Sequence, residues 1–437
     1  MIICHIPTGL ILFLLITTCL IREGFPSDRN NDDLSGWQAG FQRETIAPDF
    51  SRDNTLLYEG KPTLMISGNG FPFVNGHWFR IFEVVPGNYY LFSTHYKAEG
   101  VEEQNRCILA RILWFDDKGD QVGRAEYPAV IRIVDPGGWE EMRQIYKVPG
   151  EATRARIELI YRWDKDGKVH FGGMEFEKTD APPGRPVRLA TIHYRPEGNQ
   201  YPEENLEEFG KLIGEAASVN ADIVCLPEAI TLVGTSLDYI AASEPLPGPT
   251  TNFLGDLARK YRMYIVAGIL ESDGGVVYNT VVLMDRKGEL AGKYRKLSLP
   301  REEIEGGVTP GNSSPVFDTD FGRIGMMICW DVTFPETART LTMKGAEVIF
   351  LPIWGGNLTL AKARAIENQV YLVSSSYDMK SAVFDLEGEI ITEATEDNPV
   401  AVVEVDLNKQ KLWPWLGDLK NRIPREMPTR KAINTMY

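Results

Sequence analysis

The chain has 437 residues, 43% of them hydrophobic, and a formal net charge of -15 at pH 7. This length exceeds the roughly 100 to 200 residues of one domain, so we expect at least two domains with large apolar cores. The acidic balance, without a long basic run, argues against nucleic acid and anionic membrane surfaces as partners.

The chain begins with an apolar run from Ile6 to Ile21. This run is shorter than the about 20 residues of a membrane-spanning helix, which favours a cleaved signal peptide over residues 1–24. An uncleaved membrane anchor and a lipoprotein modified at Cys19 are the alternatives. We therefore expect an exported protein, secreted or periplasmic.

Five cysteines occur in the chain, and cleavage of the signal would remove Cys4 and Cys19. The three that remain are Cys107, Cys225 and Cys329. An odd, sparse set is not a disulfide framework, although one bridge between two of the three stays open. At least one free thiol is expected.

Residues 35–178 predict a first domain built from short strands. Apolar and polar residues alternate through Ile157, Leu159 and Tyr161, and turn pairs such as Pro149-Gly150 separate the strands. No long amphipathic helix interrupts them. This pattern is typical of an antiparallel β-sandwich.

The same region resembles jelly-roll carbohydrate-binding modules of the galactose-binding type, through "GHWFRIFEVVPGNYYLFS" and "GKVHFGGMEF". The resemblance implies a glycan as one partner. Trp78, Trp114, Trp139 and Trp163 could stack on sugar rings, but large aromatics in a sandwich more often belong to the core. A structural or substrate-screening role is therefore our first expectation.

Residues 179–187 are proline-rich and lack an apolar period, which predicts a linker. From residue 188 to residue 437 strand-like and helix-like segments alternate. Leu206, Phe209 and Ile213 fall at helical spacing, and further helices are predicted over 251–263, 335–346 and 360–369. We expect an α/β domain whose functional residues gather at the carboxyl ends of strands.

Histidines are scarce in this second domain, where only His193 occurs. A Ser-His-Asp triad or a multi-histidine metal site is therefore hard to build, and no Walker-type phosphate loop is present. We expect no metal and no cofactor. Carboxylate or lysine remains for base catalysis.

Cys329 lies where the strand-like run "GMMI" stops, before Trp330-Asp331 and a helix opening at Pro335. Free cysteine is more often a core residue. At a strand-to-helix turn, however, exposed N–H groups favour a thiolate and can hold a developing oxyanion. Two other charged residues also stand out in the sequence. Glu228 ends a strand fit for burial, and Lys296 leads into an apolar segment.

The order Glu228, Lys296, Cys329 resembles the nitrilase superfamily of carbon-nitrogen hydrolases. The resemblance covers residues 187–437 and rests on "ADIVCLPEA", "GKYRKLSLP", "GRIGMMICWDVTFPE" and "ARAIENQVYLV". It implies an αββα sandwich, with Glu228 as general base, Cys329 as nucleophile and Lys296 as the catalytic lysine.

The resemblance also implies two further site residues. The backbone N–H of Trp330 is the expected second oxyanion donor. The family's second glutamate falls on Glu305, in "EEIEGGVTPG", with Glu302 and Glu303 as neighbouring candidates.

The implied function is hydrolysis of a non-peptide C–N bond, in an amide or an N-carbamoyl (ureido) compound, through a cysteine thioester. The amidase and carbamoylase branches are favoured because nitrile-hydrolysing members usually carry Glu where this chain has Asp331. Nitrile hydrolysis, acyl transfer by the same site, and a glycan-binding module on an inactive hydrolase scaffold are the alternatives.

The expected partners are a small amide or ureido substrate and further copies of the chain. A homo-oligomer is implied because the tail over residues 421–437 resembles the arm that relatives place on a neighbouring subunit.

Overall fold

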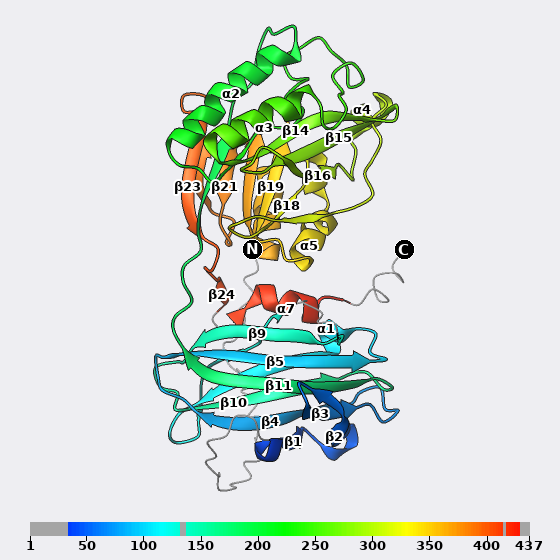
Figure 1. Cartoon of the computed structure of the whole chain (residues 1–437), viewed down its shortest axis with the longest axis vertical. Helices are drawn as coiled ribbons and strands as arrows, with labels where there is room; N and C mark the ends of the chain where they lie inside the picture. The colour runs from blue at the N-terminus through cyan, green and yellow to red at the C-terminus, as the bar shows by residue number, and fades with distance from the viewer. Residues whose placement is uncertain (1–33, 132–136, 414–416, 429–437) are drawn as a thin grey trace, which may run out of the picture.

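The computed structural model describes residues 34–131, 137–413 and 417–428, and it forms two lobes (Figure 1). The proposed signal over residues 1–24 lies outside the described residues. Within them, no helix is both long and apolar enough to span a membrane.

The first lobe is an antiparallel sandwich of two sheets. One sheet has the order β1 (Gln38–Phe41), β4 (Asn75–Glu83), β10 (Arg154–Arg162), β6 (Ile108–Phe115) and β7 (Gln121–Glu126). The other has the order β2 (Asp49–Tyr58), β3 (Lys61–Ser67), β11 (Lys168–Thr179), β5 (Tyr89–Glu99), β9 (Glu140–Lys147) and β8 (Val130–Ile131). Its short helical pieces are η1 (Leu34–Gly36), η2 (Glu44–Ile46) and α1 (Gln104–Cys107).

The core of this lobe lies between the two sheets and follows from the alternation in the sequence. In β10, Ile157, Leu159 and Tyr161 are fully buried, and they pack with Phe92 and Phe171 from the other sheet. The predicted antiparallel sandwich is confirmed. Its assignment to the jelly-roll type stays a prediction.

The four tryptophans that could bind sugar differ in their exposure to solvent. Trp78, Trp114 and Trp139 are at most 7% exposed, so they cannot stack on a sugar ring from solvent. Trp163 is 43% exposed, but the Arg162 guanidinium lies 3.8 Å from its ring centroid. Three of the four are therefore buried core residues, as is common for large aromatic side chains.

The second lobe contains two six-stranded sheets. The first has the order β16 (Leu290–Arg295), β15 (Val276–Met284), β14 (Tyr264–Asp273), β13 (Ile223–Cys225), β12 (Pro186–Ile192) and β23 (Val400–Asp406). The second has the order β17 (Val316–Asp318), β18 (Arg323–Met326), β19 (Val348–Ile353), β20 (Tyr371–Ser376), β21 (Ser381–Phe384) and β22 (Ile390–Ala394). The helices are α2 (Pro202–Ser218), α3 (Pro249–Tyr261), α4 (Arg301–Glu305), α5 (Pro335–Met343) and α6 (Leu358–Asn368), with the 3-10 turn η3 (Cys329–Thr333).

Strand β19 shows why the lobe has four layers. All six of its residues are buried, because both faces of the strand are covered. Val348 and Phe350 pack toward the other sheet, whereas Ile349 and Leu351 pack in the cluster that includes residues of α5 and α6. Helices α2 and α3 cover the outer face of the first sheet in the same way. The predicted α/β fold of the αββα type is confirmed.

The predicted helices form close to their expected bounds. α2, α3 and α5 each begin at a proline, whose fixed φ and missing N–H suit the first helical position. α5 ends at Met343, before the predicted residue 346, because Gly345 takes a left-handed φ of +95°.

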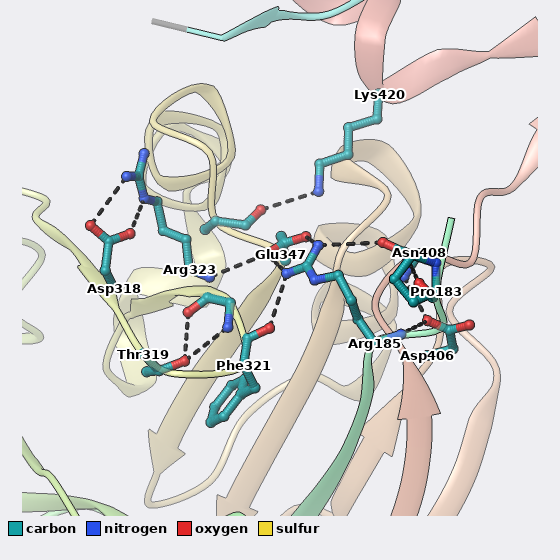
Figure 2. Close-up of polar contacts among 12 residues, drawn as sticks. Pro183, Arg185, Asp318, Thr319, Phe321, Arg323, Glu347, Asp406, Asn408 and Lys420 are labelled. Carbon is teal, nitrogen blue, oxygen red and sulfur yellow. Dashed lines mark hydrogen bonds and ion pairs between the residues drawn. The ribbon is translucent and has the colours of Figure 1, made fainter. Parts of the chain in front are cut away.

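The segment between the lobes is anchored by Arg185, as Figure 2 shows. Its guanidinium donates to both carboxylate oxygens of Glu347 at 2.8 Å and to the Phe321 carbonyl at 3.0 Å. Asn408 Nδ2 donates to the Pro183 carbonyl at 2.6 Å. The chain therefore enters the second lobe through a fixed, charge-assisted contact.

The chain's last described helix, α7 (Leu419–Glu426), follows β24 (Leu412–Trp413) and β25 (Gly417–Asp418) and lies between the lobes (Figure 1). Lys420 Nζ donates to the Ala346 carbonyl at 3.3 Å, and Asn421 Nδ2 donates to Gln144 of the sandwich at 3.1 Å. Helix α7, in which the tail expected to reach a neighbouring subunit begins, thus contacts both lobes of its own chain.

Candidate active site

Glu228 follows strand β13 after two residues, at the carboxyl end of the sheet. The chain there still pairs with β14: Gly268 N donates to the Pro227 carbonyl, and Ile230 N to the Gly268 carbonyl. A Cβ on Gly268 would lie 2.6 Å from the Glu228 Cα, so only glycine fits beside it. Ala229 has a left-handed φ of +49°, a costly conformation that turns the chain directly after the carboxylate.

Three donors hold the Glu228 carboxylate, which is 3% exposed. Oε1 accepts from Lys296 Nζ at 2.9 Å and from Asn279 Nδ2 at 2.7 Å. Oε2 accepts from the Trp354 backbone N–H at 2.9 Å. Three donors compensate this buried carboxylate for the loss of its hydrogen bonds to water.

Lys296 directly follows β16, and its side chain is fully buried. Its ammonium donates to Glu228 and to Glu303. Burial alone would lower the pKa of this lysine, but the carboxylates of Glu228 and Glu303 raise the pKa above its ordinary value. Lys296 is therefore a permanent cation inside the site.

Cys329 lies at the sharp turn between β18 and α5, with a left-handed φ of +40°. Asp331 maintains this turn. Its carboxylate, fully buried, accepts from the Ile328 N–H at 3.0 Å, from the Ser298 N–H at 2.8 Å and from the Tyr294 hydroxyl at 2.6 Å. These contacts offset the strain of a non-glycine residue in the left-handed region.

The thiol of Cys329 differs from the sequence-based expectation of a thiolate. Burial raises its pKa well above the ordinary value, and the nearby Glu228 carboxylate raises it further, while Lys296 acts in the opposite direction. The net direction favours the thiol over the expected thiolate, because loss of hydration and the negative carboxylate outweigh the turn and the lysine. Cys329 is half-buried, whereas Cys107 and Cys225 are buried, and all three are free.

The structure places Glu303, and not Glu305, beside Lys296. Glu303 is 5% exposed and lies between Lys296 and Asn279. The Glu305 side chain is exposed and forms an ion pair with Arg301 at 2.7 Å. The physical reason is rotation along α4: two residues in a helix are about 200° apart, so Glu303 and Glu305 point to opposite sides. The expectation for Glu305 is corrected to Glu303.

Trp330 follows Cys329 in the first turn of η3, and its side chain is 44% exposed. Backbone N–H groups in the first turn of a helix have no acceptor within that helix. The role of the Trp330 N–H as an oxyanion donor stays a prediction.

Two contributors to the site were absent from the sequence-based set: Asn279 and Tyr377. The Tyr377 hydroxyl donates to the Glu228 carbonyl at 2.9 Å. Asn279 lies in β15, inside the buried run "VYNTVVLM", where an amide among apolar residues was the available signal. Among the residues that the structure describes, no group of three or more His, Cys, Asp or Glu side chains is arranged to hold a metal ion.

Comparison with known proteins agrees with this geometry. The family model for carbon-nitrogen hydrolases matches residues 188–414, just over half of the chain. A nitrilase from Pyrococcus abyssi is 37% identical over 243 residues, which are 51% of this chain and 90% of that protein. The omega-amidase NIT2 of Bos taurus is 32% identical over 248 residues, 51% of this chain and 87% of that protein.

Among solved structures, that of Saccharomyces cerevisiae Nit3, a member of branch 10 of the nitrilase superfamily, is similar at 24% identity. It covers 56% of this chain and 96% of its own, with a TM-score of 0.45. From the match over residues 188–414, the chain belongs to the carbon-nitrogen hydrolase family.

Proposed function

We propose that the protein hydrolyses the C–N bond of an amide or N-carbamoyl compound through a thioester on Cys329. The observation that carries the proposal is the fully buried Lys296 ammonium, which lies between the carboxylates of Glu228 and Glu303 and interacts with Cys329. A cation is held there at high cost in desolvation, which favours a role in stabilising negative charge during a reaction. The names of two relatives, a nitrilase and an omega-amidase, support this chemistry.

In the first half of the reaction, Cys329 Sγ attacks the carbonyl carbon while Glu228 takes the thiol proton. A neutral thiol at rest fits this step, since it requires a base. Negative charge develops on the carbonyl oxygen, and Lys296 and the Trp330 N–H stabilise it. The C–N bond then breaks, and Glu228 returns the proton to the leaving nitrogen.

In the second half, water attacks the thioester carbon and Glu228 takes a proton from that water. The C–S bond breaks, the sulfur regains a proton, and a carboxylic acid leaves. One water is consumed, and one acid and one amine or ammonia are released.

Glu303 supports substrate binding in this scheme. Its Oε1 accepts from Lys296 and Asn279, whereas its Oε2 is buried with no hydrogen-bond partner among the described residues. A buried, unpaired carboxylate oxygen is unfavourable until a donor arrives. The N–H of an amide substrate is such a donor.

A release assay tests the proposed function. Wild type and Cys329→Ala are compared for ammonia or amine release on a panel of primary amides, N-carbamoyl compounds and nitriles. We expect turnover of an amide or N-carbamoyl compound, and a loss of roughly a thousandfold or more in Cys329→Ala. Turnover that survives the substitution, or none on any compound, contradicts the proposal.

Nitrile hydrolysis is the second candidate, favoured by the 37% identity to a protein named nitrilase. The presence of Asp331 at the position where nitrile-hydrolysing members usually carry Glu argues for the amide. The nitrile arm of the panel separates the two, because only a nitrilase would release acid from a nitrile.

A further inference from the structure

Four polar groups in the site form a closed ring of hydrogen bonds, and one of them, Asn279, has no part in the proposed reaction steps. Lys296 Nζ donates to Oε1 of Glu228 at 2.9 Å and to Oε1 of Glu303. Asn279 Nδ2 donates to the same two oxygens, at 2.7 Å and 3.1 Å. Each oxygen thus receives one charged and one neutral donor.

The chemistry of the ring fixes the orientation of the Asn279 amide. Turning the amide over would place Oδ1 against two carboxylate oxygens, where acceptors repel one another. In the present orientation Oδ1 is buried and has no partner among the described residues. That arrangement costs free energy, because the amide N–H groups bond to the two carboxylates while the amide oxygen has no partner.

The backbone of Asn279 contributes as well. Its carbonyl accepts from the Lys296 N–H at 2.8 Å, which continues the pairing of β15 with β16 past the end of the strand. Asn279 is 1% exposed and therefore has little freedom to move. One residue fixes where Lys296 leaves the sheet and where both carboxylates lie.

We infer that Asn279 is a positioning residue that holds Glu228 and Glu303 on either side of Lys296 without adding charge. One ammonium faces two carboxylates, so a second donor is needed, and a second cation would lower the basicity of Glu228. A neutral amide supplies two N–H groups and adds no charge to the cluster. This inference rests on the proposed function, since it assigns Asn279 to the alignment of its base.

Two variants of nearly equal size separate alignment from simple packing. Asn279→Leu removes both donors without adding charge, and we expect kcat/KM to fall roughly ten- to hundredfold, mainly in kcat. Asn279→Asp adds a third carboxylate, so the cluster binds one further proton. We then expect the acidic limb of the kcat/KM profile to move to higher pH by about one unit.

A second readout needs no turnover. The rate of alkylation of Cys329 by iodoacetamide, measured on its peptide by mass spectrometry, depends on the same coupled protons. We expect its dependence on pH to move upward in Asn279→Asp. If wild type turns over no substrate, the proposed function fails, and the alkylation profile still decides the role of Asn279.

Asn368 provides the matched control. It is also buried, its Nδ2 donates to the Arg364 carbonyl at 2.9 Å, and its Oδ1 has no partner among the described residues. Asn368→Asp and Asn368→Leu should lower thermal stability without moving either pH profile. If Asn279→Leu or Asn279→Asp fails to fold, Asn279→Ser, which keeps one donor, is used in its place. We expect a smaller loss of kcat/KM in Asn279→Ser. Unmoved profiles in Asn279→Asp, or equal shifts in Asn368→Asp, overturn the inference.

Discussion

Cys329 shows how much a single residue's environment can change its chemistry. Its turn and its lysine neighbour favour a thiolate, but the thiol is largely removed from water and faces the Glu228 carboxylate. Desolvation and a like charge both oppose ionisation, and together they outweigh the favourable terms. In the proposed reaction Cys329 is therefore a thiol that needs a base, which Glu228 would supply beside Lys296.

His77 in β4 is the residue whose titration should be visible in the stability of the sandwich. It is 6% exposed, and burial, aided by Arg156 and Arg111, lowers its pKa to about 4 despite Glu158. The unfolded chain binds this proton near pH 6.5. Stability from the neutral imidazole is thus present above pH 6.5 and is lost as pH falls toward 4, by about 3 kcal/mol in total.

Urea denaturation of wild type and His77→Gln from pH 7 to pH 4, followed by tryptophan fluorescence, measures this effect. Other groups also titrate in this range, so the difference between the two proteins is the relevant quantity. The stability of His77→Gln should decline less steeply below pH 6.5. Parallel pH curves for the two proteins would show that His77 is protonated equally in both states.

At the scale of elements, the single-turn helix α4 decides which glutamate enters the site. We expect Glu303→Gln to lower kcat/KM roughly a hundredfold or more, because it removes a charge that aligns Lys296. Glu305→Gln should stay within about twofold, since its ion pair with Arg301 lies in solvent.

Steady-state kinetics on the best substrate of the panel, with circular dichroism to verify folding, compares these two variants. They lie two positions apart on the same helical turn, so each is the control for the other. Equal losses in the two variants would mean that the orientation of α4 in solution differs from the one described.

At the scale of the whole molecule, the junction between the lobes depends on Arg185. We expect Arg185→Ala to lower the free energy of unfolding of the hydrolase lobe by about 1 to 2 kcal/mol, because it removes the contacts to Glu347 and Phe321. Both partners are partly exposed, which keeps the effect small.

Calorimetric unfolding of Arg185→Ala beside Arg301→Ala tests this expectation. The Arg301 side chain is 83% exposed and pairs within α4, so its removal should cost less than about 0.5 kcal/mol. Arg185→Lys keeps the charge but loses the paired contact, and an intermediate value is expected. Identical unfolding of Arg185→Ala and Arg301→Ala would exclude a role of the junction in stability.

The linear sequence by itself determined the elements and the main chemical groups. Apolar residues at every second position predicted the sandwich, and apolar residues at helical spacing predicted the helices of the α/β lobe. Such spacing can be recognised from neighbouring residues, because it records which face of an element is buried. Glu228 and Cys329 stand out at the ends of strand-like runs, but the roles of Glu228, Lys296 and Cys329 were assigned through the resemblance to the nitrilase superfamily. Their separation along the chain did not prevent their identification.

Only the tertiary structure decided which glutamate faces Lys296, that Asn279 completes the ring, that the thiol is neutral and that α7 returns to its own sandwich. Each of these depends on distances between segments remote in sequence and on how fully water is excluded. The pKa of a charged group and the direction of a side chain depend on all the atoms that surround them in three dimensions. Local sequence patterns carry no information about those surroundings.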